Sequence, residues 1–132
     1  MKKGSLLLLV GLLLLPGCAA SNAEEGTYRQ VHMDEAVRLM EEETDYIILD
    51  VRTQAEYTQT HIPGAICLPN EEIGTEKPDV LPDLDQLILI YCRSGNRSKQ
   101  AASKLAGMGY TNIVEFGGIN DWRGEVVTGA QP

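Results

Sequence analysis

Two uninterrupted runs of apolar residues constrain the fold more than any other feature of the chain. Residues 46–49 read Tyr-Ile-Ile-Leu and residues 87–91 read Leu-Ile-Leu-Ile-Tyr. A strand with one face in water alternates apolar with polar side chains, whereas a strand buried on both faces is apolar throughout. Helical patterns occur between such runs, which is typical of a parallel sheet. We therefore predict an α/β domain with a mainly parallel sheet and helices on both faces.

Shorter patterns predict the other elements. We expect further strands at residues 28–31, 65–68 and 112–116, and helices from Asp34, over 55–57, over 98–106 and over 119–122. The Asp34 carboxylate is expected to cap the first helix, because it can accept the free amides of a first turn. Residues 70–86 contain six carboxylates and two prolines, which predicts a helix fragment and surface loops. Gly117-Gly118 is expected to form a turn.

The first residues predict export. Met1-Lys2-Lys3 precedes the apolar run 6–15 and then Pro16-Gly17-Cys18-Ala19-Ala20, which is the order of a signal peptide. This run is too short for a membrane-spanning helix, which needs about 20 residues. Residues 15–18 resemble the lipobox of bacterial lipoproteins. The resemblance implies a signal peptide over 1–17 and a Cys18 lipid anchor that holds the protein on a bacterial membrane of the cell envelope, facing outside the cytoplasm. Ordinary cleavage near Ala20 is the alternative.

The remainder of the chain has room for one domain. Residues 18–26 are small and polar and predict a lipidated tether, and residues 27–132 can form a single hydrophobic core. Loss of Lys2 and Lys3 with the signal would change the net charge from −8 to −10. Such an acidic protein is not expected to bind nucleic acid or anionic lipid headgroups. The expected partners are small molecules or other proteins.

A cysteine directly follows the second apolar run and opens a short loop before a helical pattern. The segment reads Cys92-Arg93-Ser94-Gly95-Asn96-Arg97-Ser98. Gly95 can adopt a positive φ, which lets the amides of a curled loop converge on one point as a nest for an anion. The helix that follows adds free amides and the positive end of its dipole. A thiol at that point is stabilised as the thiolate, so we predict that Cys92 is a nucleophile.

The charges around this loop favour the same interpretation. Residues 87–113 contain no Asp or Glu, although the whole chain is acidic. Arg93 and Arg97 lie in the loop and flank the thiol, so they are expected to attract an anion. Lys99 and Lys104 are interpreted as the solvated face of a helix. The sequence thus predicts a locally positive site in an acidic protein.

Several motifs occur together in an order that resembles the rhodanese family. They are Asp50-Val51-Arg52, Glu56-Tyr57, His61-Ile62-Pro63-Gly64-Ala65, the loop 92–98, and Gly117-Gly118 with Trp122. Ordered motifs of this kind are far more specific than any one of them. The resemblance implies a single rhodanese-like domain with a five-stranded sheet. Thr60 stands where the family usually has glycine, which is expected to affect only the turn.

The same resemblance implies an activity. Cys92 would accept a sulfane sulfur as a persulfide from a small anionic donor such as thiosulfate and pass it to a thiol or cyanide, or to a protein acceptor. Neither a metal nor an organic cofactor is implied. The donor would bind to the loop residues Arg93, Ser94, Gly95, Asn96 and Arg97.

Four further residues are assigned supporting roles by the resemblance. Asp50 and Arg52 would brace the loop through charged hydrogen bonds, while Glu56 and His61 would hold the adjoining segment. We interpret His61 as a packed or capping residue rather than a general base. Cys67 is interpreted as a small buried apolar residue, and a disulfide between it and Cys92 is the alternative.

Other functions that use similar features are kept as alternatives. Cysteine-dependent phosphatases and arsenate reductases also place a thiolate in an amide-lined loop, but the phosphatase loop is Cys-x5-Arg, whereas Cys92 to Arg97 is Cys-x4-Arg. A rhodanese-like binding module is the non-enzymatic alternative, because a fold does not fix a function. Thiol redox exchange is a third, although the chain has no Cys-x-x-Cys pair.

Overall fold

The computed structural model describes residues 27–132. The expected signal peptide 1–17, Cys18 and the tether 18–26 lie outside the described residues, so they stay predictions. Within the described part of the chain, no helix combines the length and the apolar composition needed to span a membrane.

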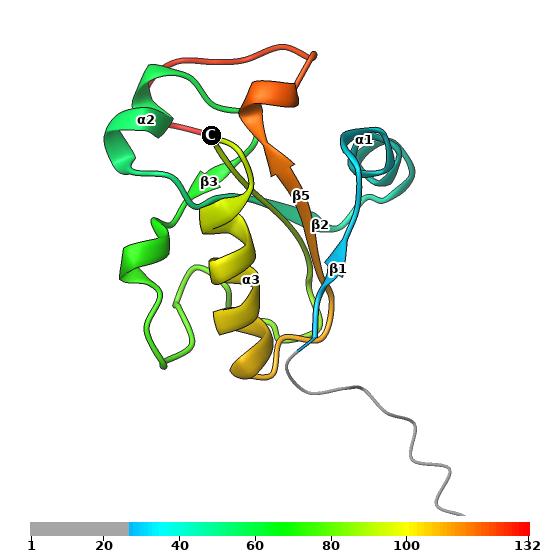
Figure 1. The fold of residues 1–132 in the computed structure, drawn as a ribbon, viewed down its shortest axis with the longest axis vertical. Helices are drawn as coiled ribbons and strands as arrows, with labels where there is room; N and C mark the ends of the chain where they lie inside the picture. Colours follow the sequence, from blue (N-terminus) through cyan, green and yellow to red (C-terminus); the bar gives the residue numbers. More distant parts are fainter. Residues whose placement is uncertain (1–26) are drawn as a thin grey trace, which may run out of the picture.

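A five-stranded sheet forms the centre of the domain (Figure 1). Its order is β1-β5-β4-β2-β3, and each pair of neighbouring strands is parallel. The strands are β1 (Arg29–Gln30), β2 (Tyr46–Asp50), β3 (Ile66–Cys67), β4 (Leu87–Cys92) and β5 (Ile113–Gly118). The two apolar runs are the adjacent inner strands β2 and β4, which confirms the predicted parallel α/β sheet.

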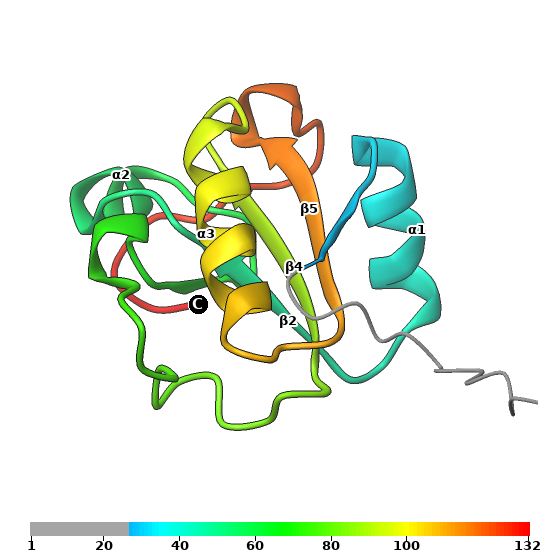
Figure 2. The ribbon, with the colours of Figure 1, turned by 60° about the horizontal axis from the view of Figure 1, so that its bottom comes forward.

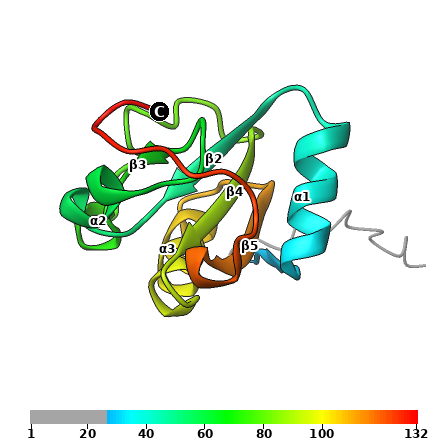
Figure 3. The ribbon, with the colours of Figure 1, turned by 90° about the horizontal axis from the view of Figure 1, so that it is seen from above.

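Helices cover both faces of this sheet. The helices are α1 (Met33–Glu42), α2 (Gln54–Gln59) and α3 (Asn96–Gly107), with short 3-10 turns η1 (Asn70–Glu72) and η2 (Ile119–Asp121). Figures 2 and 3 show α1 and α3 on opposite sides of β4 and β5. One core cluster joins α3 to Ile88 and Ile90, and the other joins α1 and Tyr57 of α2 to Leu87 and Leu89. Alternate side chains of β4 therefore enter two cores, which explains why the strand is apolar throughout.

The start of α1 differs from the prediction. The helix begins at Met33 with His32 at the N-cap position, and no side chain caps it. Asp34 is therefore not the cap but a first-turn residue, where its charge favours the helix dipole. The sequence pattern predicts an apolar face of Ala36, Val37 and Met40. Ala36 is buried, Val37 and Met40 are half-buried, and Leu39 is the second buried residue.

The end of β5 also differs from the prediction. Gly117-Gly118 was expected as a turn, but β5 continues through both residues. The strand can continue because the pairing with β4 shifts register after Ile90, so that Gly118 lies opposite Cys92. Gly117 has a φ of +92°, which a glycine adopts without strain. The carboxyl ends of β4 and β5 therefore meet at Cys92, at the edge where α/β sheets place their ligands.

The last residues return across the domain to α2. His61 and Val127 form an isolated antiparallel bridge, and the Gly129 amide donates to the Thr58 carbonyl at 2.8 Å. Figure 3 shows this terminal segment crossing from η2 toward α2. The C-terminal segment thus ties α2 to the end of the sheet that carries Cys92.

We expect Leu105→Ala to lower the free energy of unfolding by about 2–5 kcal/mol, because it leaves a cavity in a well-packed core. Leu105 is fully buried between α3 and the sheet. Val80→Ala is the control, since Val80 is 51% exposed and should change stability by less than about 0.5 kcal/mol. Urea denaturation measures both, and equal effects of the two substitutions would contradict the assigned core.

Candidate active site

Cys92 is the last residue of β4, and three residues separate it from α3. Gly95 adopts a φ of +110° at the N-cap of that helix, which confirms the predicted positive φ. Its amide is thereby turned toward the sulfur and donates to Cys92 Sγ at 3.0 Å. The local sequence thus forms a curled loop whose amides point at a thiol.

The electrostatics of the loop favour the thiolate. Cys92 is 1% exposed, and burial alone would raise its pKa. Hydrogen bonds from the amides of Ser98, Gly95 and Ser94 act against burial, and the pKa of the Cys92 thiol is lowered. The site therefore favours the reactive thiolate more than the surroundings of an ordinary cysteine do.

Gly118 holds the loop from the side of β5. A Cβ on Gly118 would lie 1.9 Å from the Arg93 carbonyl oxygen and 2.5 Å from the Ser94 nitrogen. The Asn120 amide also donates to the Arg93 oxygen at 3.2 Å. Only glycine permits this close approach of two backbones, and the approach fixes the peptide that follows Cys92.

Glu56 pairs with the two arginines beside the thiol. Arg97 donates to both Glu56 oxygens, at 2.9 and 3.2 Å, and the Arg93 Nε is 4.0 Å from Glu56 Oε1. The Arg97 hydrogen bond lowers the pKa of the Glu56 carboxyl. A capping box with Thr53 at the start of α2 holds Glu56 in place. Glu56 therefore links α2 to the loop, as part of its expected supporting role.

The expected positive field is consequently weaker than the sequence predicts. Arg97 lies in the first turn of α3 rather than in the loop, and its guanidinium is engaged by Glu56. Arg93 remains available, with 61% of its side chain exposed. Ser94 in the loop and Asn96 at the start of α3 are exposed as well, so their side chains lie on the outer surface of the site.

Two residues next to the thiol were missed by the sequence analysis. Ser98 Oγ lies 3.4 Å from Cys92 Sγ and 2.6 Å from Glu115 Oε1. Ser98 is fully buried and Glu115 is 2% exposed. A carboxylate inside the otherwise apolar strand 113–116 was the signal that could have identified Glu115.

Asp50 and Arg52 form a buried ion pair next to the site. Arg52 donates to both Asp50 oxygens and, at 2.6 Å, to the Thr60 carbonyl oxygen. The pair therefore braces the segment before His61 and not the loop itself, which corrects the expected contact. The reason is that Arg52 turns back along its own segment, while Glu56 reaches the loop.

His61 lies in a packed environment. It is fully buried, its ring stacks on Tyr57 with centroids 3.7 Å apart, and Nδ1 lies 2.9 Å from the Tyr57 carbonyl oxygen. These contacts agree with the packed residue predicted from the turn motif. Nε2 is buried without a hydrogen-bond partner.

Cys67 and Cys92 differ in the direction in which the pKa of the thiol is shifted. Burial, together with the negative charges of Asp50 and Glu72, raises the pKa of the Cys67 thiol to about 11. It is half-buried rather than fully buried, and both cysteines are free thiols. The disulfide alternative is therefore wrong for this structure.

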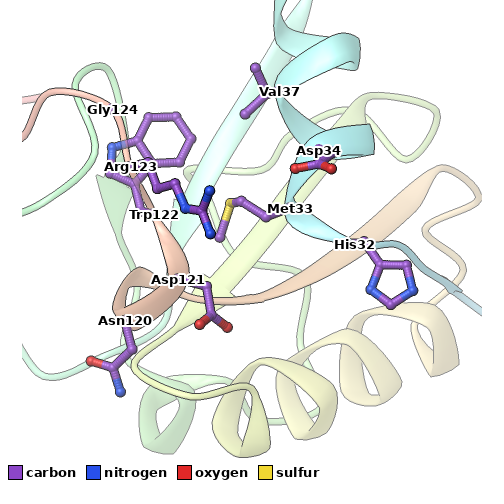
Figure 4. A pocket seen from close by; sticks show the side chains of 9 residues that line it. All are labelled: His32, Met33, Asp34, Val37, Asn120, Asp121, Trp122, Arg123 and Gly124. Atoms are coloured by element: carbon purple, nitrogen blue, oxygen red, sulfur yellow. The ribbon is translucent and has the colours of Figure 1, made fainter.

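A separate cavity of about 730 Å³ lies between α1 and η2 (Figure 4). Met33 points from α1 toward Trp122 and Arg123 across this space. Its lining residues are His32, Met33, Asp34, Val37, Asn120, Asp121, Trp122, Arg123 and Gly124. None of these belongs to the site predicted around Cys92.

Comparisons with known proteins agree with this geometry. The sequence model of the rhodanese-like domain family matches residues 32–125. The thiosulfate sulfurtransferase PspE of Escherichia coli (strain K12) is 37% identical over 73 residues, which are 55% of this chain and 70% of that protein. A sulfurtransferase of Allochromatium vinosum is 41% identical over 79 residues, 59% of this chain and 72% of that protein. A solved structure of a rhodanese with anions from E. coli has a TM-score of 0.59 and 34% identity, and the match covers 64% of this chain and 99% of that chain.

We expect Gly118→Ala to displace the loop, because the added Cβ meets the backbone of Arg93 and Ser94. The substitution should cost about 1–3 kcal/mol of stability and raise the pH midpoint of Cys92 alkylation by about one unit. Mass spectrometry of the Cys92 peptide after timed alkylation measures the midpoint.

Gly107→Ala is the matched control. A Cβ on Gly107 meets nothing within 4 Å, and alanine favours a helix over glycine by about 1 kcal/mol. This variant should keep the alkylation profile and be as stable as the parent or more so. An unchanged profile in Gly118→Ala would show that the close approach does not set the loop geometry.

Proposed function

This chain belongs to the rhodanese-like domain family and is a sulfurtransferase of the rhodanese type, and we propose that Cys92 carries the sulfur as a persulfide. The observation that carries the proposal is the Gly95 amide 3.0 Å from a buried Cys92 sulfur whose pKa is lowered. We propose that the donor is a small sulfur-containing anion such as thiosulfate and that the acceptor is a thiol or cyanide.

In the first step, the Cys92 thiolate attacks the outer sulfur of thiosulfate. A bond forms between the two sulfurs, the S–S bond of the donor breaks, and sulfite leaves with the electron pair. The loop amides stabilise the negative charge that gathers on the transferred sulfur. Arg93, which is the more available of the two arginines, is positioned to attract the donor's oxygens.

In the second step, an acceptor thiolate or cyanide attacks the terminal sulfur of the persulfide. The bond to Cys92 breaks, and its electron pair returns to Cys92 as a thiolate. The same amides that lower the thiol's pKa make this thiolate a good leaving group. Both steps therefore depend on one feature, the set of amides that converges on Sγ.

The loop favours a sulfur substrate over a phosphate monoester. Cys92 and Arg97 are one residue closer in sequence than in a phosphatase loop, and the Arg97 guanidinium already holds Glu56. A phosphate would have to compete with that carboxylate for the arginine. The curated relatives named as sulfurtransferases support the same choice.

We expect purified protein to gain one sulfur atom on the Cys92 peptide after thiosulfate treatment and to form thiocyanate when cyanide is added. Cys92→Ser should lose essentially all of both signals, because serine cannot hold a sulfane sulfur. Cys67→Ser should keep both, since the Cys67 thiol stays protonated near neutral pH. A persulfide on Cys67, or phosphatase turnover faster than sulfur transfer, would refute the assignment.

We also propose, from residues 1–18 alone, that the mature protein is lipidated at Cys18 and held on a bacterial membrane. Cys18→Ser should shift the protein from the membrane fraction to a soluble or uncleaved form, because it removes the residue that would carry the lipid. The lipid on Cys18 would have to include more than one acyl chain to anchor the protein stably. Cell fractionation with intact-mass measurement checks this. A variant that stays processed and membrane-bound like the parent would rule out Cys18 as the anchor.

A further inference from the structure

Glu115 is a buried carboxylate next to the sulfur site. It is 2% exposed, and its Oε1 accepts hydrogen bonds from the Ser98 hydroxyl at 2.6 Å and the Gly117 amide at 2.8 Å. Both donors are neutral, although a buried carboxylate is usually held by a cation. A carboxylate with such partners beside a thiolate loop requires a functional explanation, because two nearby anions repel each other.

The position of the Ser98 hydrogen decides how Glu115 acts on the sulfur. Ser98 has one hydroxyl hydrogen, and four acceptors lie within reach: Glu115 Oε1 at 2.6 Å, the Gly95 carbonyl oxygen at 3.0 Å, the Gly117 carbonyl oxygen at 3.3 Å and Cys92 Sγ at 3.4 Å. A charged acceptor at the shorter distance forms the stronger hydrogen bond. Ser98 therefore donates to Glu115 and turns a lone pair toward Cys92. That lone pair accepts from a thiol S–H and repels a thiolate.

Other titratable and charged groups also lie near this pair. Glu115 lines a cavity of about 320 Å³ together with His32 and Lys99. Arg97 and Arg93 lie with Glu56, where α2 meets the loop. Arg97 also interacts electrostatically with Cys92, whereas the Ser98 hydroxyl, which Glu115 holds, is in hydrogen-bond contact with the sulfur.

We propose that Glu115 is a positioning residue for sulfur transfer: by holding the Ser98 hydrogen it opposes ionisation of Cys92 and keeps the sulfur strongly nucleophilic. The proposal rests on the proposed role of Cys92 as the sulfur carrier. The intrinsic nucleophilicity of a thiolate falls as its pKa falls, and the best attacking thiol has a pKa near the ambient pH. The loop amides lower the pKa of Cys92, and Glu115 limits how far they do so.

The test is the pH dependence of Cys92 alkylation by iodoacetamide, followed on the Cys92 peptide of the full chain by mass spectrometry. This measurement uses no sulfur donor, so it does not depend on whether the protein transfers sulfur. Glu115→Gln keeps the shape of the side chain and an oxygen for the Gly117 amide, but it removes the negative charge that holds the Ser98 hydrogen most strongly. It should lower the pH midpoint by about one unit and reduce the rate at high pH about threefold, as thiolate nucleophilicity predicts.

A second substitution shows whether the effect passes through Ser98. In a Ser98→Ala background, Glu115→Gln should shift the midpoint clearly less, because no hydroxyl hydrogen remains to be released to the sulfur. Glu125→Gln is the control, since Glu125 is an exposed carboxylate of the C-terminal segment, and it should leave the midpoint unchanged.

Three results would overturn the proposal. The first is an unchanged or higher midpoint in Glu115→Gln, and the second is an equal shift with and without Ser98. The third comes from Ser98→Ala alone and remains available if Glu115→Gln does not fold. If Glu115 holds the hydrogen, Ser98→Ala should change the midpoint little, whereas a rise of about one unit would place that hydrogen on the sulfur.

Discussion

The contact between the end of β5 and the peptide after Cys92 is the constraint on which the site depends. Gly118 has no side chain, so the Arg93–Ser94 peptide can pack against its backbone. With that peptide fixed, the left-handed Gly95 brings its amide to 3.0 Å from the sulfur. The side chains of Arg93 and Ser94 take no part in this backbone contact and remain exposed. Substitution of these two side chains should therefore leave the backbone of the loop in place.

The site stabilises an anion mainly with dipoles rather than with net charge. Arg97 is neutralised by Glu56, and Glu115 adds a second carboxylate near the sulfur. The amides at the start of α3 and in the loop supply the opposing partial charges. Amide dipoles act over a short range and suit a single sulfur atom, whereas a free guanidinium would add the bidentate hydrogen bonds that favour a phosphate dianion. The distribution of charge thus agrees with a sulfurtransferase more closely than with a phosphatase.

Local patterns predicted the parts of the structure that depend on neighbouring residues in the sequence. The strands β2 and β4 follow from unbroken apolar runs, and the positive φ of Gly95 follows from a glycine just before a helix. The Ser98–Glu115 contact joins α3 to β5, and no local pattern contains both residues. Gly118 likewise resembled a turn residue. The reason that it must lack a side chain is its contact with the backbone of Arg93 and Ser94, which lie far from it in the sequence. The cap predicted at Asp34 is wrong because the helix starts at Met33, with His32 at the N-cap position and no side-chain cap.

The two cysteines of the domain show that position within the sheet decides which thiol reacts. Cys67 lies in β3 and Cys92 in β4, with β2 between them. Strands lie about 4.8 Å apart, so two intervals give about 10 Å, which exceeds the Cα separation of roughly 7 Å that a disulfide can span. Cys67 also lies near Asp50 and Glu72, which keep its thiol protonated. The persulfide that we propose on Cys92 would therefore be protected from attack by the other thiol of the domain and would remain available to an acceptor from outside.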